Sequence, residues 1–409
     1  MAPPKKQKVA NKSQQARHNP PKQQTFTGII GTTSTRSTQK ISETQQQAAP
    51  IQLQQSILDV FCRAFHGDQR SLDDINASIQ KVKGHLFLRE FSHAFAKQEY
   101  LDAYALRWSA SRALGYLDIL LHGDLQDFWL GEITSRPDDN NNAADAHTST
   151  DAADPPREQS DSGACRIACI GGGGGAEVAA CAAAALALST TTFDSARSGP
   201  RPLSLSLSPS SKAEIHAIDI ADWSGCVEKL TTALTAPREL SAYASESAKA
   251  ANKPLIDPGC LQVRFSQRDI LNADEDALRG LLGGVGLCTI MFTLNELFTD
   301  SIARATAFLL ALTDVMALGS WFLVVDSPGS YSEVKLGNGE DAKSKRYPMK
   351  WLLDHTLLEV AGGKNSKWRK HVSDDSRWFR LNPALKYPMD LENMRYQIHL
   401  YQRIESEGS

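Results

Sequence analysis

Five consecutive glycines, Gly171 to Gly175, separate a short apolar run from an alanine-rich segment. Residues 165–170 suit a buried strand, and residues 178–188 suit a helix. A strand that turns into a helix through glycines lets a ligand approach the backbone closely and places that ligand at the positive end of the helix. The pattern therefore predicts a nucleotide-type binding site, and its alternative is a flexible polyglycine loop.

Apolar runs alternate with plausible helices from residue 163 onward. This order is typical of a parallel sheet with helices on both faces, so we predict a Rossmann-like α/β fold. Residues 396–403 alternate with period two and predict an antiparallel edge hairpin. The predicted parallel strands are residues 165–170, 214–218, 261–265, 288–293 and 321–325.

Charge and composition divide the chain further. The formal net charge is -3, but residues 1–50 carry +7 and residues 137–162 carry -6. Neither stretch has apolar periodicity, so neither buries enough surface to offset the entropy of ordering. The basic stretch resembles a nuclear localisation signal or a phosphate-binding tail, and a merely solvated terminus explains it equally well. The predicted organisation is a disordered basic arm (1–50), an α-helical subdomain (51–135), a disordered acidic linker (136–162) and an α/β domain (163–405) with a low-complexity insertion near 190–212.

The seven cysteines never stand at Cys-x-x-Cys spacing, so neither a disulfide framework nor a zinc cluster is expected. No apolar leader follows the basic start, and charged residues or glycines interrupt the most apolar stretches. We therefore expect an intracellular monomer without a metal or a membrane partner, in the nucleus, the nucleolus or the cytoplasm.

Carboxylates follow each of the first three predicted strands and would meet at one edge of the sheet. Glu177 comes directly after the glycines, where it would repel a pyrophosphate but could hold the ammonium group of S-adenosylmethionine. Asp219 ends the second strand, where a ribose-binding acid belongs, although it could also cap a helix starting at Trp223. After the third strand, Asp269 could accept from an adenine amino group while Ile270 stacks on the ring, and the alternative for Asp269 is again a cap.

The glycines also match the dinucleotide motif G-x-G-x-x-A through Gly171, Gly173 and Ala176, so an NAD(P) domain is an alternative that Glu177 disfavours. Asp219 follows Gly171 by 48 positions, more than the usual roughly 20, but the separation is 25 without the low-complexity residues 190–212. The predicted cofactor-binding residues are Gly171, Gly173, Gly175, Glu177, Asp219, Asp269, Ile270 and Thr293.

The segment after the fourth predicted strand would lie beside a transferred methyl group. Asn295 can donate and accept, which matches the amide and carbonyl edge of a base, while Glu296 could take a proton. We therefore predict that both residues are catalytic. The alternative is that they cap a helix beginning near Ser301.

Substrate contacts are predicted from the helical subdomain and from the loop after the fifth strand. Tyr100, Tyr104, Arg107 and Ser111 recur at i, i+4, i+7 and i+11 and would share one helix face. In one interpretation, tyrosine and arginine side chains close over the crevice to stack a base or hold a phosphate. In the other, the helix is simply packed and its arginines neutralise nearby acids. The predicted substrate-binding residues are Tyr104, Arg107, Arg112, Asp326 and Tyr331, of which Asp326 also suits a turn.

Several segments together resemble the fungal 25S ribosomal RNA uridine-N3-methyltransferases. The resemblance covers residues 51–403, apart from the two low-complexity insertions and a loop at 236–254. Two departures are an all-glycine loop, where the family commonly carries a proline, and Ala110 at an apparent proline position. The matching segments are YALRWSASRALGY (104–116), CRIACIGGGGGAEV (165–178), DIADW (219–223), FTLNELF (292–298), VDSPGSY (325–331) and YPMDLENMRYQ (387–397).

This resemblance implies a class I S-adenosylmethionine-dependent methyltransferase that acts on N3 of a uridine, with ribosomal RNA or a pre-ribosomal particle as its partner. Because uracil N3 carries a proton, such an enzyme needs a general base or donors that stabilise the uracil anion. Asn295 would orient the imide edge and Glu296 would be the base. A methyltransferase of a protein or small molecule and a noncatalytic cofactor- or RNA-binding module stay open as alternatives, as does the identity of the modified nucleotide.

Overall fold

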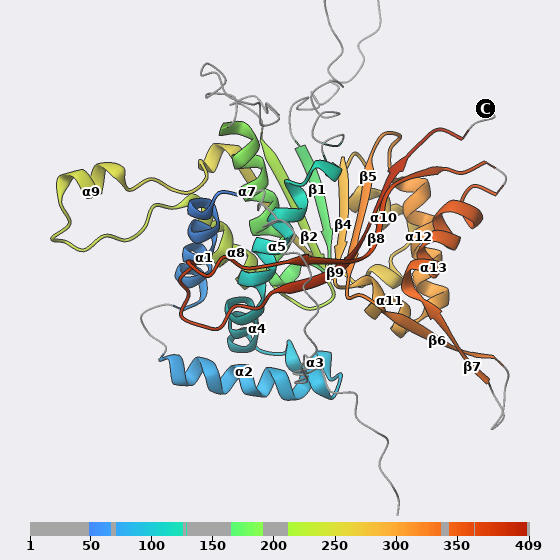
Figure 1. Ribbon diagram of the computed structural model, residues 1–409, viewed down its shortest axis with the longest axis horizontal. Coiled ribbons are helices and arrows are strands. Elements are labelled where there is room, and N and C mark those ends of the chain that lie inside the picture. The colour runs from blue at the N-terminus through green and yellow to red at the C-terminus, as the bar shows by residue number, and fades with distance from the viewer. Residues whose placement is uncertain are drawn as a thin grey trace, which may run out of the picture. The chain divides into compact units, whose positions relative to one another are not determined.

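The computed structural model describes residues 49–66, 71–125, 128, 165–190, 212–336, 343–363 and 365–406. The predicted acidic linker and almost all of the predicted basic arm and low-complexity insertion lie outside these residues. Within the described part, helices cover both faces of a central sheet (Figure 1), which confirms the predicted α/β fold.

The central sheet has seven strands in the order β3-β2-β1-β4-β5-β9-β8. Strands β1 to β5 are parallel, β9 is antiparallel to β5, and β8 is antiparallel to β9. The strand order reverses between β1 and β4, so a ligand crevice is expected outside the carboxyl ends of these two strands. The strands of this sheet are β1 (Cys165–Ile170), β2 (Ala213–Asp219), β3 (Leu261–Gln267), β4 (Leu287–Met291), β5 (Trp321–Asp326), β8 (Trp368–Phe379) and β9 (Met394–Arg403).

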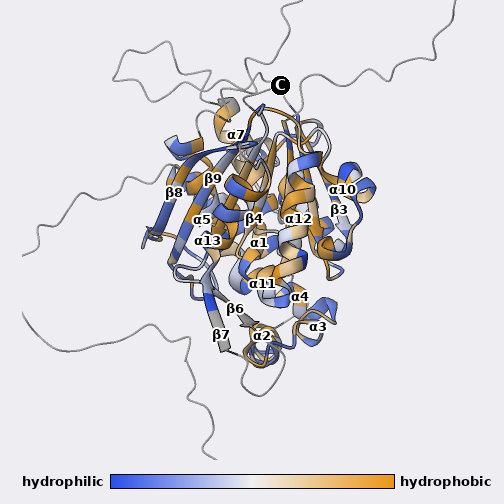
Figure 2. Cartoon of the chain, turned by 90° about the vertical axis from the view of Figure 1, so that its right-hand side faces the viewer, coloured by the Kyte–Doolittle hydropathy of each residue, from blue (hydrophilic) through white to orange (hydrophobic). Residues whose placement is uncertain are grey.

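The five predicted parallel strands are all present, and the predicted antiparallel hairpin at the edge of the sheet is confirmed. Strand β9 is its inner strand, and β8, which was not predicted, pairs with its other side and forms the edge. Strand β8 is long and carries alternating polar residues, which suits an edge that meets water (Figure 2). A separate hairpin, β6 (Tyr331–Leu336) with β7 (Lys343–Pro348), follows β5 and was not predicted.

The helices form two groups about the sheet. Helices α1, α5, α7 and α8 share one hydrophobic core with the sheet, and α10 to α13 share the other. The described helices are α1 (Ile51–Phe65), α2 (Leu72–Phe87), α3 (Phe91–Ala94), α4 (Gln98–Tyr104), α5 (Ala110–Leu120), α7 (Ala176–Thr190), α8 (Ser224–Thr235), α9 (Glu246–Ala251), α10 (Glu275–Leu282), α11 (Leu294–Asp300), α12 (Ile302–Val315) and α13 (Met349–Asp354), with 3-10 turns at Gly123–Leu125, Gly172–Gly174, Pro258–Cys260 and Ile270–Asn272 and π-helical segments at Ala105–Ser109 and His355–Val360.

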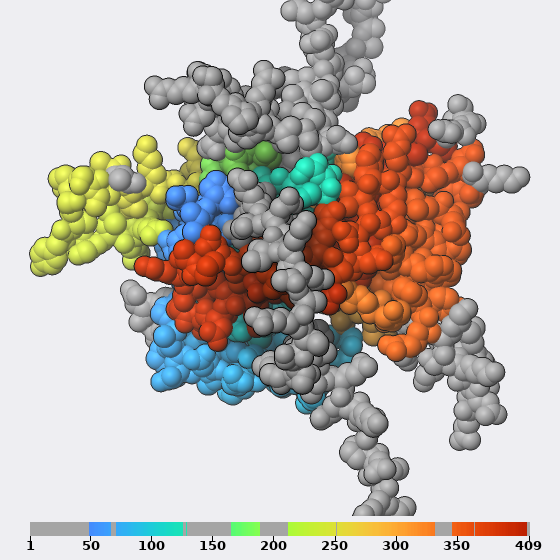
Figure 3. All heavy atoms as spheres, viewed as in Figure 1, coloured from blue at the N-terminus to red at the C-terminus, as the bar shows by residue number. Residues whose placement is uncertain are grey.

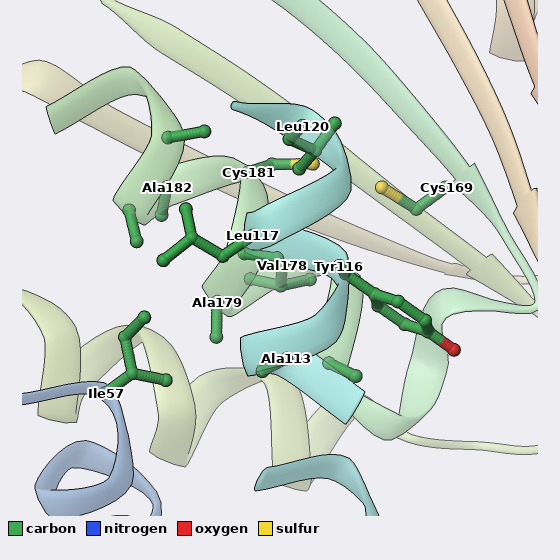
Figure 4. Close-up of a cluster of buried hydrophobic side chains, with 14 of the residues drawn as sticks. Ile57, Ala113, Tyr116, Leu117, Leu120, Cys169, Val178, Ala179, Cys181 and Ala182 are labelled. Carbon is green, nitrogen blue, oxygen red and sulfur yellow. The ribbon is translucent and has the colours of Figure 1, made fainter. Parts of the chain in front are cut away.

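Side chains along β1 point alternately into the two hydrophobic cores. Ile167 and Cys169 face the core that contains α7, whereas Ala168 and Ile170 face the core that contains α12. On the α7 side, small alanines let α5 pack closely, with Leu117 beside Val178 (Figure 4). The N-terminal helices therefore complete the core of the sheet rather than forming a core of their own.

The segment between β8 and β9 lies against the N-terminal helices (Figure 3). The backbone NH of Lys386 donates to Oε1 of Gln55 in α1, and the hydroxyl of Tyr387 donates to the carbonyl of Leu106. Residues far apart in the sequence are thus tied together at this face. Among the helices of the described ranges, none has both the length and the apolar character needed to cross a bilayer.

Candidate active site

The glycine run forms an ordered turn at the carboxyl end of β1. Gly171 and Gly175 have φ angles of +76° and +82°, a left-handed conformation that favours glycine. A Cβ added at Gly171 would lie 2.2 Å from Oγ1 of Thr293, and one at Gly173 would lie 2.2 Å from Cδ1 of Trp223. The loop is therefore closely packed, and the alternative of a flexible polyglycine loop was wrong.

Asp219 lies beside this turn at the end of β2. Its carboxylate accepts hydrogen bonds from the backbone NH groups of Gly173 at 3.1 Å and Ala221 at 3.2 Å. Burial raises its pKa to about 6 despite these hydrogen bonds. Helix α8 begins at Ser224 without a side-chain cap, so the alternative that Asp219 caps it was wrong.

An exposed apolar side chain next to Asp219 was not predicted. Ile220 is 66% exposed, and Gln267 donates to its carbonyl oxygen. An apolar surface beside a buried carboxylate and a glycine turn suits an adenosine, whose ring needs an apolar wall and whose ribose needs an acceptor. The sequence signal was its position, directly after the acid that ends the second strand.

Asp269 and Ile270 stand in a 3-10 turn after β3. Asp269 accepts from the backbone NH of Leu271 at 3.0 Å and from the side-chain amide of Asn272 at 2.6 Å. Ile270 is buried and belongs to the core on the α12 side. The capping alternative therefore describes the contacts of Asp269, and the adenine contacts of both residues stay predictions.

Glu177 is enclosed beneath the glycine turn. The side chain is 2% exposed, and Oε1 accepts from the hydroxyl of Thr289 at 2.7 Å. Burial raises the pKa of this carboxyl well above its usual range. A nearby ammonium group would offset that penalty, but its contact with Glu177 stays a prediction.

The chain between β4 and α11 is strained at Phe292. This residue has a φ of 59°, which is rare for a bulky side chain and often marks a functional site. Its backbone NH donates to the carbonyl of Val325 at 2.7 Å, which fixes the turn against β5. The turn brings Thr293 against Gly171 and starts α11, so it joins the carboxyl ends of β1 and β4.

Asn295 stands in the first turn of α11 and is held from β5. Its backbone NH donates to Oδ2 of Asp326 at 3.0 Å, and Asp326 also accepts from the NH of Ser327. Burial raises the pKa of Asp326 to about 6. The side-chain oxygen of Asn295 is buried and has no hydrogen-bond partner among the described residues. Helix α12 is capped by Ser301 itself, so the alternative that Asn295 and Glu296 cap it was wrong.

Glu296 forms an ion pair that was not predicted from the sequence. Its Oε2 lies 2.5 Å from a terminal nitrogen of Arg89, and both side chains are about half exposed, at 42% and 55%. Arg89 follows α2, so this ion pair joins the N-terminal helices to α11. Glu296 is thus near Asn295 in the chain, but its lone pairs are shared with a guanidinium.

The N-terminal helices cover the glycine turn through a π-helical segment, Ala105–Ser109. A Cβ added at Gly174 would lie 3.2 Å from the Ser109 hydroxyl and 3.3 Å from the ring of Tyr104. Arg112 donates to the hydroxyl of Tyr104 at 2.9 Å and lies over the ring of Phe292. Because π-helical turns often occur at functional sites, the covering segment is a candidate wall of the crevice.

The other predicted substrate residues, Arg107, Tyr331 and Asp326, contact parts of the chain other than the glycine turn. Arg107 donates to the carbonyl of Asp390 and pairs with Glu392 at 2.5 Å, so it fits the interpretation in which arginines neutralise acids. Tyr331 is 48% exposed, with the guanidinium of Arg346 5.2 Å from its ring centroid. Asp326 and Ser327 do form a turn after β5, as the alternative expected.

Comparison with known proteins agrees with this geometry. A family model described as "Putative SAM-dependent methyltransferase" matches residues 61–402. The chain is 30% identical over 356 residues to the 25S rRNA (uridine(2843)-N(3))-methyltransferase of Saccharomyces cerevisiae, and the alignment covers 85% of each protein.

Solved structures show weaker likeness. Magnesium protoporphyrin IX methyltransferase from Synechocystis is 11% identical, with a TM-score of 0.28 over 59% of this chain and 71% of that chain. The 16S rRNA (adenine(1408)-N(1))-methyltransferase from Catenulisporales acidiphilia is 13% identical, with a TM-score of 0.29 over 59% of this chain and 90% of that chain. The family model and the yeast relative, each covering most of the chain, decide the assignment. The chain belongs to this family of S-adenosylmethionine-dependent methyltransferases.

Proposed function

We propose that this protein methylates N3 of a uridine in large-subunit ribosomal RNA, inside the cell, with S-adenosylmethionine as the methyl donor. The observation that carries the proposal is the buried side-chain oxygen of Asn295, which has no partner among the described residues. A buried acceptor without a donor costs about 1–3 kcal/mol, so it suits a site where a substrate N–H arrives. A neutral uracil presents such an N–H between two carbonyls, and the yeast relative is named for N3 methylation of uridine.

The residues at the β1 and β2 ends fit the cofactor. The glycine turn presents backbone without side chains, which would collide with Thr293 or Trp223, and Asp219 offers an acceptor for a ribose hydroxyl. Ile220 would support the adenine ring, and Glu177 would face the ammonium group of the methionyl part. When bound, S-adenosylmethionine supplies an electrophilic methyl group on a sulfonium.

The chain's own residues would prepare the uracil nitrogen. Asn295 would accept from N3–H as the uracil arrives and donate its amide to a neighbouring carbonyl, which selects an imide edge. After Glu296 has taken the N3 proton, the amide hydrogen bond to the carbonyl would stabilise the uracil anion. Asp326 holds the start of α11 through the NH of Asn295 and therefore positions this side chain. Glu296 would remove the N3 proton, and its ion pair with Arg89 would open or shift as the proton transfers.

An RNA partner is supported by aromatic and basic side chains at the same edge of the sheet. Trp378 pairs across the ladder with Arg395, two residues before Gln397, which pairs with Asp326. Trp378 is 41% exposed, and the guanidinium carbons of Arg380 and Arg395 lie 4.2 Å and 5.6 Å from its ring centroid. An exposed indole with arginines on it can stack a base and contact phosphates.

A second exposed aromatic group follows the β6–β7 hairpin. Trp351 of α13 is 46% exposed and stacks on His355 with ring centroids 4.9 Å apart. The backbone NH of Met349 donates to the carbonyl of Ser330, which ties α13 to the loop after β5. We infer that the substrate RNA crosses this edge between the two tryptophans.

The test is methyl transfer by the purified full chain to ribosomal RNA and to pre-ribosomal particles, followed by mass spectrometry of the nucleosides. The expected product is 3-methyluridine, formed more slowly by Asn295→Ala and Glu296→Gln than by the wild type. Asn252→Ala is the matched control, since the Asn252 side chain forms hydrogen bonds with the backbone NH and carbonyl of Arg238, and both residues are far from α11 in the sequence. Transfer to protein or small molecules alone, or cofactor binding without transfer, would overturn the proposal.

A further inference from the structure

Three side chains with metal-ligating atoms converge outside the proposed active site. His85 lies in the last turn of α2, and Glu90 and His93 belong to the turn that follows and to α3. One ligand atom from each lies within 4.8 Å of the others. We propose that His85, Glu90 and His93 bind one divalent transition-metal ion of the Zn²⁺ type.

The backbone brings these residues together through a strained turn. Arg89 has a φ of 59°, at a position where helices usually carry glycine. The NH of Glu90 donates to the carbonyl of His85 at 2.8 Å, and the NH of Arg89 donates to the carbonyl of Leu86 at 3.1 Å. The reversal turns Glu90 back toward α2. A non-glycine residue in this conformation persists where surrounding contacts hold it, and metal ligands on both sides of Arg89 would do so.

Distances within the cluster are close to those of a metal site. Nδ1 of His85 lies 2.9 Å from Oε2 of Glu90, and the rings of His85 and His93 are stacked with centroids 5.6 Å apart. Ligands bound at about 2.0–2.2 Å to a tetrahedral ion lie roughly 3.4 Å from one another. Small side-chain rotations would therefore replace the His85–Glu90 hydrogen bond with two metal bonds.

The donor set selects the kind of ion. Two imidazoles and one carboxylate suit Zn²⁺, Co²⁺ or Ni²⁺, whereas Mg²⁺ and Ca²⁺ prefer oxygen donors. The side chains of His85 and Glu90 are 31% and 42% exposed, so water can fill the fourth position. Three ligands distinguish this cluster from another histidine-acid pair, His122 with Asp124 at 3.1 Å, which has no third ligand among the described residues.

The ion would act on the active site through Arg89. This arginine lies inside the loop that the metal would close, and its side chain pairs with Glu296. Fixing the turn would reduce the freedom of Arg89 and hold Glu296 in place. Metal binding itself does not depend on the proposed RNA substrate, whereas this coupling to Glu296 rests on the proposed function.

The test uses the full chain after treatment with a chelator. Co²⁺ is titrated first, because its visible spectrum reports nitrogen and oxygen ligands and shows a separate charge-transfer band when thiolates bind. Zn²⁺ is then added in competition. We expect one high-affinity ion, with binding weakened at least about 10-fold in His85→Ala, His93→Ala and Glu90→Gln. His122→Ala should bind as the wild type does.

A second readout separates this site from adventitious binding. Zn²⁺ should slow amide hydrogen exchange in residues 85–93 of the wild type and leave it unchanged in Glu90→Gln, which keeps the size of the side chain. Equal affinity in a His85→Ala/His93→Ala double variant, or a thiolate band as the main signal, overturns the proposal. Loss of the metal with unchanged methyl transfer would remove only the coupling to Glu296.

Discussion

Replacing Asn295 by alanine should stabilise the protein while it impairs methyl transfer. The side-chain oxygen of Asn295 is buried without a partner among the described residues, and removing such an orphan recovers about 1–3 kcal/mol. Alanine also adds about 0.5 kcal/mol of helix propensity relative to asparagine in the first turn of α11. The backbone hydrogen bond to Asp326 is kept, since it comes from the NH group. The free energy of unfolding should therefore rise by about 1–3 kcal/mol.

The same substitution removes the proposed contacts of Asn295 with the imide edge of the uracil. If the hydrogen bond from its amide to the uracil carbonyl contributes about 1–3 kcal/mol in the transition state, kcat/KM should fall about 5- to 150-fold. Urea unfolding at several denaturant concentrations gives the stability, and initial rates of methyl transfer to ribosomal RNA give kcat/KM.

Asn252→Ala is the matched control. Oδ1 of Asn252 accepts from the backbone NH of Arg238 in a hydrogen bond that is exposed to water, so alanine there should change neither stability nor transfer by as much. The reasoning fails if Asn295→Ala is less stable than the wild type, or if it transfers methyl groups at the wild-type rate.

Three further predictions concern the cofactor turn, the buried acids and the RNA surface. Gly173→Ala places a Cβ 2.2 Å from Trp223, so it should cost about 1–3 kcal/mol of stability and weaken cofactor binding. Gly84 has open space around it inside α2, and Gly84→Ala should therefore raise the free energy of unfolding, measured in urea, by about 0.5–1 kcal/mol. The pKa of Asp326 is raised to about 6, so its contribution to stability is full below the ordinary pKa of about 3.9 and is lost as pH rises through about 6. The stability of Asp326→Asn relative to the wild type should thus improve between about pH 5 and about pH 7.5, and a flat difference in urea midpoints would contradict the burial argument. Trp378→Ala should raise the Kd for single-stranded ribosomal RNA by about 5- to 150-fold, since stacking on one base contributes about 1–3 kcal/mol, while Tyr243→Ala, at a tyrosine 97% exposed, should bind RNA normally in a fluorescence titration.

Local patterns were enough to predict the parallel sheet and the glycine turn. Residues 165–178 place a strand, five glycines and a helix in direct succession, and the structure has β1, a turn and α7 there. Asp219 was predicted to lie beside the glycines, and it accepts a hydrogen bond from Gly173. These features follow from short patterns of neighbouring residues and from the order of the strands along the chain, and both can be read directly from the sequence.

Contacts that depend on the path of the chain were not predictable. The pair of Arg89 with Glu296 joins residues 207 positions apart, and no sequence period links them. The π-helical segment at Ala105–Ser109 shifts the helix register, so the predicted single face from Tyr100 to Ser111 does not continue unchanged. Strand β8 reads as polar and charged, because an edge strand needs few apolar residues, and it was therefore missed. The domain boundaries at 135 and 163 stay predictions.

The tie between the β8–β9 segment and the first helices bears on how the chain folds during synthesis. Gln55 of α1 forms its hydrogen bond with Lys386, and Leu106 forms one with Tyr387, across separations of 331 and 281 residues. Neither hydrogen bond can form until the later residue has been synthesised. Helices made first would keep part of their apolar surface uncovered until Leu385, Tyr387 and Met389 have been synthesised, a state in which chaperones bind and aggregation begins. We expect that chains stopped before residue 380 are captured by holding chaperones, and that release into the native fold follows the emergence of β9.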